Sequence, residues 1–375
     1  MSGPGLPNIR GHEALLDRVR LALEAGRIPQ SLLFHGPEGV GKRTLALWTG
    51  AALLCTGQES PCGECRSCRM AARLEHPDIH YHFPMPRPKR ASSRKKLREA
   101  IETQRQERLA RLRDEPDVPI DEGEVSGIYL TAVENIRDAA SRRPAMGSRA
   151  VFIIAEADRM VPQDANPEAA NAFLKLLEEP PDFATIMLTS SRPHALLPTV
   201  RSRTAFVRVP PLAEDDVVAH LIETREMPVG AARAAARRAG GSIGRALTLS
   251  ASEEDEVGAA ADRLLAAALR ADPESRYAAA GQFTARGARS ILAPALEELE
   301  VRLRDVICAA SGADDHAQDP ERSRRIRERW PLGEPAVLAA ISAVESARED
   351  AHRNLNPQST VSTLLLEMSR AFGSS

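Results

Sequence analysis

Aromatic side chains are scarce in this sequence, at 3% of its 375 residues. Long apolar runs are also missing: none reaches the ~18 residues of a membrane-spanning helix, and the N-terminal residues lack the apolar stretch of a secretory signal. We therefore expect a cytoplasmic protein with reduced thiols and no membrane partner. Charge is balanced, because the sequence has 50 Lys and Arg and 52 Asp and Glu, which gives a formal net charge of -2. The whole chain thus has no bulk attraction for nucleic acid.

What is present is a regular alternation of strand-like and helix-like segments in the first half of the chain. Short apolar runs predict five strands, at 31–35, 78–83, 149–158, 184–191 and 204–209. Helices are expected over 44–55, 128–144 (after a strand end) and 166–181. This alternation indicates an α/β fold with a parallel five-stranded sheet. After Pro211 no strand pattern is evident, which predicts three short helices and then an all-helical domain.

Residues 84–127 do not fit the sheet pattern and are interpreted as a charged insertion. Eleven Lys and Arg but only three Glu lie within 87–113, and an acidic run follows. The positions that share one narrow helix face are Leu97, Ile101, Arg108 and Leu112. We expect a long exposed helix, either a solvated surface helix or an arm that binds DNA or a partner protein. Without interleaved aromatics, any DNA contact would be to phosphate and sensitive to salt.

Four of the five cysteines fall in one short window. Cys55, Cys62, Cys65 and Cys68 have the spacing C-x6-C-x2-C-x2-C. Four thiolates are what a closed, structural zinc site needs, so we expect structural zinc in a module at about 55–68. Disulfides are disfavoured in the cytosol, a redox dithiol needs only two cysteines, and an iron–sulfur cluster stays open as an alternative.

The stretch HGPEGVGKRTLA, residues 35–46, is similar to a phosphate-binding loop of the pattern G-x-x-x-x-G-K-[ST]. The candidate nucleotide-binding residues are Gly36, Gly39, Gly41 and Lys42. Arg43, however, stands where a Ser or Thr hydroxyl would bind Mg²⁺, and a guanidinium has no acceptor and would repel the metal.

The second magnesium contact of such sites usually comes from an Asp at the end of a buried strand. After the strand at 151–154, Ala155 occupies that position and Glu156 follows it. Both metal-side positions therefore lack the expected side-chain oxygen. Three interpretations stay open from the residues alone: no nucleotide at all, ATP or ADP bound without hydrolysis, and active hydrolysis.

Several segments occur in one order with plausible spacing. They are RIPQSLLFHGPEGVGKRTLA, the four-cysteine module, HPDIHYHFP, NAFLKLLEEPPDFATIMLTSSRPHALLPTVRSRT and GSIGRAL. Together they resemble the clamp loader subunits of bacterial DNA polymerase III, in the AAA+ superfamily, and among these the delta-prime type. The resemblance implies an AAA+ P-loop core over 1–209, a small helical lid over 210–252 and an all-α collar domain over 253–375.

The resemblance also implies roles for single residues. Ser202 and Arg203 match a Ser-Arg-Cys motif, with Thr204 in third place, whose arginine reaches the ATP of a neighbouring subunit as an arginine finger. Thr189 and Ser190 stand at the first sensor, and Arg245 matches the second.

A delta-prime subunit would not hydrolyse ATP itself. Its implied partners are the gamma/tau ATPase subunits, the delta subunit, the sliding clamp and primer-template DNA. The alternative is a self-sufficient gamma-type AAA+ ATPase, for which Ser or Thr at position 43 and Asp at 155 would be expected.

Overall fold

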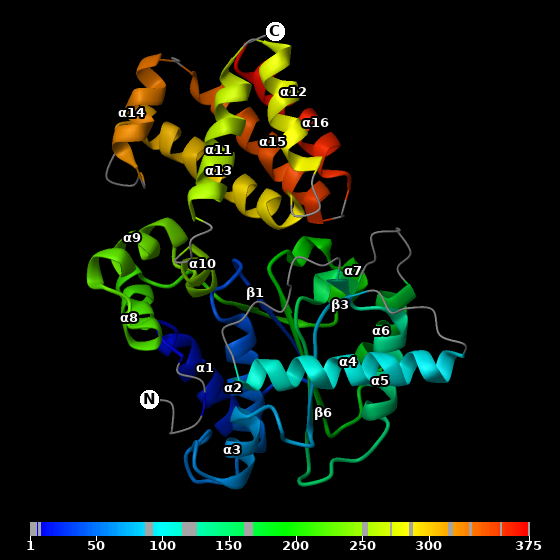
Figure 1. The fold of residues 1–375 in the computed structure, drawn as a ribbon. Coiled ribbons are helices and arrows are strands. Elements are labelled where there is room, and N and C mark those ends of the chain that lie inside the picture. Colours follow the sequence, from blue (N-terminus) through cyan, green and yellow to red (C-terminus); the bar gives the residue numbers. More distant parts are fainter. Residues whose placement is uncertain are drawn as a thin grey trace. The chain divides into compact units, whose positions relative to one another are not determined.

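The computed structural model describes most of the chain. The described residues are 6, 9–86, 93–114, 126–160, 168–249, 254–270, 272–284, 288–313, 317, 319–329, 332–352 and 355–373. The chain divides into two compact units, Met1–Leu247 and Thr248–Ser375, and each has its own core (Figure 1). In the described part, no helix combines the length and the apolar character needed to cross a lipid bilayer.

The first unit is built on a parallel sheet of five strands, as predicted. In spatial order these are β2 (Ile79–His82), β5 (Ala150–Ile154), β6 (Ala184–Ser190), β1 (Ser31–His35) and β7 (Ala205–Arg208). Every neighbouring pair is parallel. All residues of β5 and β6 are buried, which accounts for their unbroken apolar runs. The carboxyl ends of the strands therefore lie along one edge, where the glycine loop meets Ser190 through the bond from the Gly36 N–H to the Ser190 carbonyl.

Helices cover both faces of this sheet. They are α1 (Glu13–Glu24), α2 (Lys42–Leu54), α3 (Arg66–Ala72), α5 (Leu130–Ala140), α6 (Glu168–Glu178) and α7 (Pro198–Arg201), with short 3-10 turns at Ala157–Met160 and Pro193–Ala195. The predicted helices at 44–55 and 128–144 are confirmed. Of the helix predicted at 166–181, Glu168–Glu178 is observed, and its first two residues lie outside the described part. The strand end before the second helix belongs to a separate antiparallel pair, β3 (Met85–Pro86) with β4 (Ser126–Gly127).

The charged insertion forms helix α4 (Arg94–Asp114), but the expectation of an exposed helix is wrong for one of its faces. Ile101, Arg105 and Leu109 are buried, and the two apolar residues join the main core. Arg105 is satisfied in this position because its Nη1 donates to the Tyr81 carbonyl at 2.9 Å and Glu102 pairs with its charge. Residues 87–92 and 115–125 of the insertion lie outside the described part.

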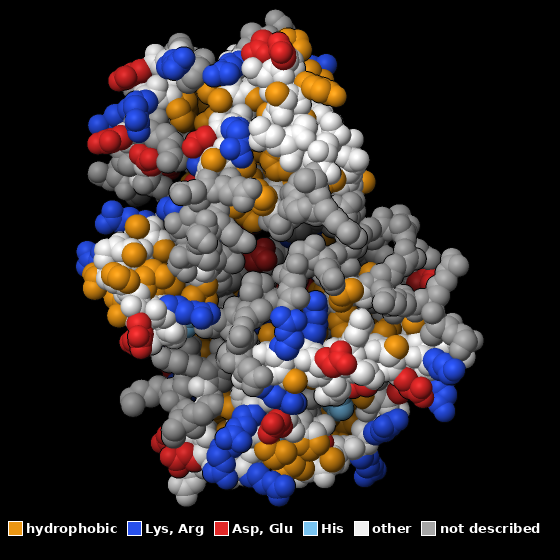
Figure 2. Space-filling view, in the orientation of Figure 1, with side chains coloured by type: hydrophobic (Ala, Val, Ile, Leu, Met, Phe, Trp, Pro, Cys, Tyr) orange, Lys and Arg blue, Asp and Glu red, His pale blue; other side chains and the backbone are white. Residues whose placement is uncertain are grey.

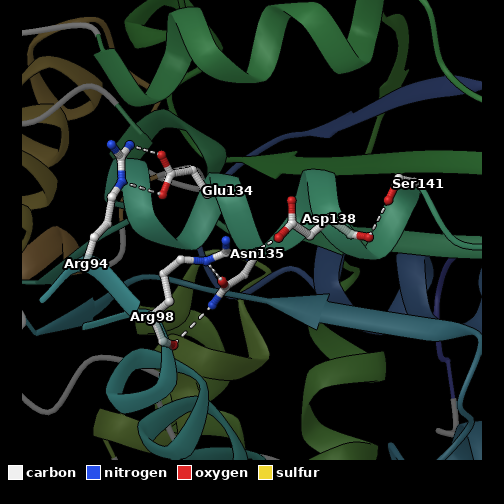
Figure 3. A network of polar contacts seen from close by, with 6 residues as sticks. All are labelled: Arg94, Arg98, Glu134, Asn135, Asp138 and Ser141. Carbon is white, nitrogen blue, oxygen red and sulfur yellow. Dashed lines mark hydrogen bonds and ion pairs between the residues drawn. The ribbon is translucent and has the colours of Figure 1, made fainter. Parts of the chain in front are cut away.

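A row of polar contacts joins α4 to α5 (Figure 3). Arg94 pairs with Glu134, and Arg98 pairs with Asp138 while its Nε donates to Asn135 Oδ1 at 2.7 Å. Figure 2 shows side chains of both charge signs over this region. Some of the basic residues of α4 are therefore already paired with acidic residues of α5.

Three further helices follow in the chain, as the sequence predicted. They are α8 (Glu214–Arg225), α9 (Val229–Ala239) and α10 (Ile243–Leu249). The residue after α8, Glu226, and the residue after α9, Gly240, both have positive φ, and this left-handed conformation ends each helix.

The described elements of the second unit are all helical, which confirms that expectation. They are α11 (Glu254–Leu269), α12 (Pro273–Gly281), a 3-10 turn at Gln282–Thr284, α13 (Ala288–Ala310), α14 (Pro320–Arg329), α15 (Glu334–His352) and α16 (Pro357–Ala371). Helix α13 runs against α15, and the core between these helices includes Leu299, Leu303 and Val344. The domain boundaries at 209 and 252 stay predictions.

Candidate functional site

The glycine loop lies between β1 and α2, where the sequence placed it. Gly39 and Gly41 have φ of 71° and 92°, a left-handed backbone that favours glycine. A Cβ at Gly36 would lie 2.0 Å from the Val209 carbonyl oxygen, so this position also excludes any side chain. The loop ends at the N-terminus of α2, whose free N–H groups and dipole favour an anion. The backbone thus has the form of a phosphate cradle.

Lys42 is buried, with 7% of its surface exposed, at the first position of α2. Its ammonium donates to the carbonyls of Gly36 (2.9 Å) and Pro37 and to Ser191 Oγ (2.9 Å). Burial lowers the pKa of Lys42 to about 8, against the opposing effect of nearby acids that include Glu38. In this structure three oxygens therefore satisfy the three ammonium donors.

The metal side of the loop carries no usable oxygen at either predicted position. Arg43 is the second residue of α2, and Ala155 is fully buried directly after β5. Glu156 follows with φ of 49°, its N–H donates to Thr189 Oγ1 at 3.1 Å, and its carboxylate pairs with Arg159 at 3.0 Å. Burial raises the pKa of Glu156, although the Arg159 charge opposes this.

Asp158 is the next carboxylate along the chain, and both of its oxygens already have partners. Ser190 Oγ donates to Asp158 Oδ1 at 2.7 Å, and Arg192 Nη2 lies 2.9 Å from Oδ2. Asp158 is buried, so these two partners compensate its charge. It therefore supports the carboxyl end of β6 rather than replacing the missing oxygen at position 155.

Helix α10 meets the glycine loop directly. The Gly244 N–H donates to the Gly39 carbonyl at 3.1 Å. A Cβ on Gly39 would lie 2.2 Å from Ser242 Oγ, and one on Gly244 would lie 2.9 Å from Gly39 Cα. Arg245 is the next residue, so the structure brings the backbone of the predicted second sensor to the loop. Gly244 was not singled out from the sequence, because the contact joins segments about 200 residues apart.

Arg203 follows α7 and is 36% exposed at its side chain. Its Nη2 lies 2.9 Å from Glu178 Oε1 on α6, and its Nη1 donates to the Thr199 carbonyl at 3.0 Å and to Ser202 Oγ at 3.4 Å. The sequence placed Ser202 beside Arg203 but gave Glu178 no role, although it belongs to the LLEEPP segment. The guanidinium is therefore held by two helices while part of it stays open to solvent.

The four cysteines of the predicted module converge. Their sulfur atoms all lie within 4.8 Å of one another, with Cys62–Cys68 and Cys55–Cys65 separations of 4.0 Å. A tetrahedral site with Zn–S bonds near 2.3 Å has sulfur atoms about 3.8 Å apart, whereas a disulfide would bring two of them to about 2.05 Å. The set thus fits a four-coordinate metal such as zinc, and Cys308, in the second unit, takes no part.

Backbone N–H groups point at these sulfur atoms, as thiolate ligands require. The Gly57 N–H donates to Cys55 Sγ at 3.3 Å and the Cys68 N–H to Cys65 Sγ at 3.4 Å. Burial would raise the pKa of Cys65, but hydrogen bonds involving Thr56 and Cys68 outweigh it and lower that pKa to about 6. Burial raises the pKa of Cys68. Leu6 packs on the module beside Cys68.

Known proteins resemble part of this chain. Residues 11–213 match the family model described as DNA polymerase III, delta subunit. DNA polymerase III subunit delta' of Pseudomonas aeruginosa is 31% identical over 173 residues, which cover 46% of this chain and 40% of that protein. The subunit delta' of Escherichia coli is 28% identical over 236 residues, or 62% and 58% of the two chains. Subunit gamma/tau of Mycobacterium tuberculosis is 29% identical over 218 residues, or 57% and 30%. The matches therefore span less than two thirds of these relatives.

Proposed function

This chain belongs to the DNA polymerase III, delta subunit, family, and we propose that it is a clamp loader subunit of the delta-prime type. In this role it joins gamma/tau ATPase subunits and a delta subunit in a cytoplasmic complex. That complex opens the sliding clamp and places it on primed DNA. Residues 253–375, within the second unit, supply a helical collar segment for the assembly.

The observation that carries this proposal is the chemistry at the metal side of the glycine loop. Arg43 and Ala155 supply neither the hydroxyl nor the carboxylate that normally holds Mg²⁺ beside a triphosphate. Asp158, the nearby alternative, is committed to Ser190 and Arg192. ATP or ADP could still rest against the loop backbone, but this chain would not hydrolyse it.

Arg203 gives such a subunit its part in the reaction. The partly exposed side chain of Arg203, held beside Ser202, acts in trans as an arginine finger and stabilises negative charge on the transferring phosphate of a neighbouring subunit. Arg245 is assigned to the contact between the lid and the glycine loop, because it follows Gly244, whose N–H bonds to the Gly39 carbonyl.

Zinc has a structural role in the proposal. Cys55, Cys62, Cys65 and Cys68 would hold it, and four ligands leave no position for a substrate. Since Cys55 directly follows the last residue of α2, the metal would fix the far end of the helix that begins at Lys42.

A gamma-type ATPase is the second candidate. A gamma/tau relative is 29% identical to this chain, which is similar to the identity of the delta' relatives, and the loop retains its glycines and Lys42. ATP hydrolysis by the purified chain with Mg²⁺ separates the two. The delta-prime role predicts no turnover above background, and the gamma-type role predicts robust turnover.

The proposal is tested by reconstitution with gamma/tau and delta subunits from the same organism. We expect native mass spectrometry to show this chain in the complex, and Arg203→Ala to lower the ATPase and clamp-loading rates without preventing assembly. Arg233→Ala is the matched control, since Arg233 is an exposed arginine on α9, and should leave both rates unchanged. Full activity of the Arg203→Ala complex would contradict the proposal.

A further inference from the structure

Glu178 and Arg203 come from different helices and meet at the surface of the first unit. Glu178 is the last residue of α6, and Arg203 lies two residues beyond the end of α7. Their Oε1 and Nη2 atoms are 2.9 Å apart, with 47% of the Glu178 side chain and 36% of the Arg203 side chain exposed. α6 and α7 are also in direct contact (Figure 1). The backbones that carry Glu178 and Arg203 are therefore held close to each other.

The surroundings of Arg203 fix the plane of its guanidinium. Nη1 donates to the Thr199 carbonyl and Ser202 Oγ, while Nη2 pairs with Glu178. A guanidinium has five N–H donors in a rigid plane, so these partners leave donors for a further anion. An unrestrained arginine would have to lose the rotamer freedom of a long side chain each time it bound a phosphate.

We propose that Glu178 is a positioning residue for Arg203: it holds the guanidinium in the orientation that a neighbouring subunit's triphosphate requires. This inference rests on the proposed function, because it assigns a partner to the arginine finger. Glu178 does not touch the nucleotide. It acts through Arg203, and its carboxylate stays paired with Nη2 while the remaining N–H groups bind phosphate.

The effect of Glu178 should be modest and confined to the chemical step. Ion pairs between partly exposed groups contribute little free energy. Orientation of the finger matters most when charge develops on the transferring phosphate. Loss of the carboxylate should therefore lower kcat and leave KM for ATP unchanged. A residue with a merely structural role would lower the amount of folded subunit instead.

The chain offers a matched control next to Glu178. Glu179 is also exposed and has the same charge, and no ion pair to Arg203 is observed for it. The test measures kcat and KM for ATP in reconstituted complexes that carry Glu178→Gln, Glu179→Gln or Glu178→Asp. Each substitution is made in the unaltered chain, and the two Gln changes are repeated with Arg203→Ala. Native mass spectrometry and thermal unfolding check that each variant folds and assembles.

We expect Glu178→Gln to lower kcat about two- to fivefold with KM unchanged, Glu179→Gln to have no effect, and Glu178→Asp to restore part of the loss. With Arg203→Ala in place, Glu178→Gln should add no further loss, because the two residues act as one unit.

Unchanged kcat in Glu178→Gln, while Arg203→Ala alone is impaired, would overturn the positioning role and leave the proposed function standing. A higher kcat in Glu178→Gln would also overturn it, since the ion pair would then restrain the finger. Full activity of Arg203→Ala would instead contradict the proposed function itself.

Discussion

Gly39 of the glycine loop and Gly244 of α10 meet backbone to backbone, with a hydrogen bond of 3.1 Å from the Gly244 N–H to the Gly39 carbonyl. The approach is so close that neither position has space for a Cβ. The glycine loop and the start of α10 are therefore in direct contact, and a substitution in one should affect the conformation of the other.

Gly244→Ala should destabilise the first unit by about 1–3 kcal/mol, because its new methyl group would press on the Gly39 backbone. Gly230→Ala is the control, since a Cβ there meets nothing within 4 Å and the residue lies in helix α9. The Gly230→Ala substitution should raise the free energy of unfolding by up to about 1 kcal/mol. Urea unfolding of the purified chains measures both. Equal effects of the two substitutions would mean that the glycine contact is not tight.

The buried Lys42 should make stability depend on pH in the alkaline range. Its pKa is lowered to about 8 in the folded chain, chiefly by burial, and is near 10.4 when unfolded. Between these values the unfolded state binds more protons, so stability rises with pH. Relative to Lys42→Met, the unfolding free energy of the unaltered chain should increase by about 2 kcal/mol between pH 8 and pH 10.

The comparison with Lys42→Met removes the contributions of all other titrating groups, because these are shared by both chains. Urea unfolding at pH 7, 8, 9 and 10 gives the difference directly. It should be flat from pH 7 to 8 and rise above pH 8. A difference that stays flat or falls toward pH 10 would show that the ammonium is not buried as described.

Leu109 should behave as a core residue even though it lies in the most charged segment of the chain. Leu109→Ala should cost about 2–4 kcal/mol, since its side chain is buried in the core of the first unit. Gln104→Ala changes an exposed residue of the same helix and should leave stability unchanged. The loss at Leu109 should persist in 1 M salt, which screens ion pairs but not apolar packing. A negligible loss of unfolding free energy in Leu109→Ala would instead support a solvated helix.

One zinc ion per chain is expected, held by the four-cysteine module. Cys62→Ser should release the metal and lower stability, because binding energy at a structural site is also folding energy. Cys308→Ser, a cysteine change in the second unit, should leave the metal bound. Atomic absorption on the purified chains with thermal unfolding measures both effects. Retention of full zinc by Cys62→Ser would exclude the four-cysteine site.

Local patterns in the sequence predicted the sheet and the cluster of four cysteines well, for a physical reason. The strand at Ala150–Ile154 is buried on both faces, so its residues are all apolar and easily recognised. The cysteines lie within 14 positions, so their spacing alone constrains their geometry. These features need no knowledge of distant parts of the chain.

Features that depend on distant partners were not predicted. Arg105 is buried in a charged helix because Tyr81, 24 positions away, offers a carbonyl. Leu109 was overlooked because eleven basic residues around it dominate the pattern. The partners of Arg203 and Gly39, namely Glu178 and Gly244, likewise come together only through the fold.

We propose that this chain lacks an ATPase site of its own and completes that of a neighbour through Arg203. Pre-steady-state ATP hydrolysis by the reconstituted complex tests it most directly, because the burst amplitude counts the sites that react quickly. We predict that Arg203→Ala lowers the amplitude by one ATP per complex while the complex stays assembled. An unchanged amplitude in the assembled complex would contradict the account.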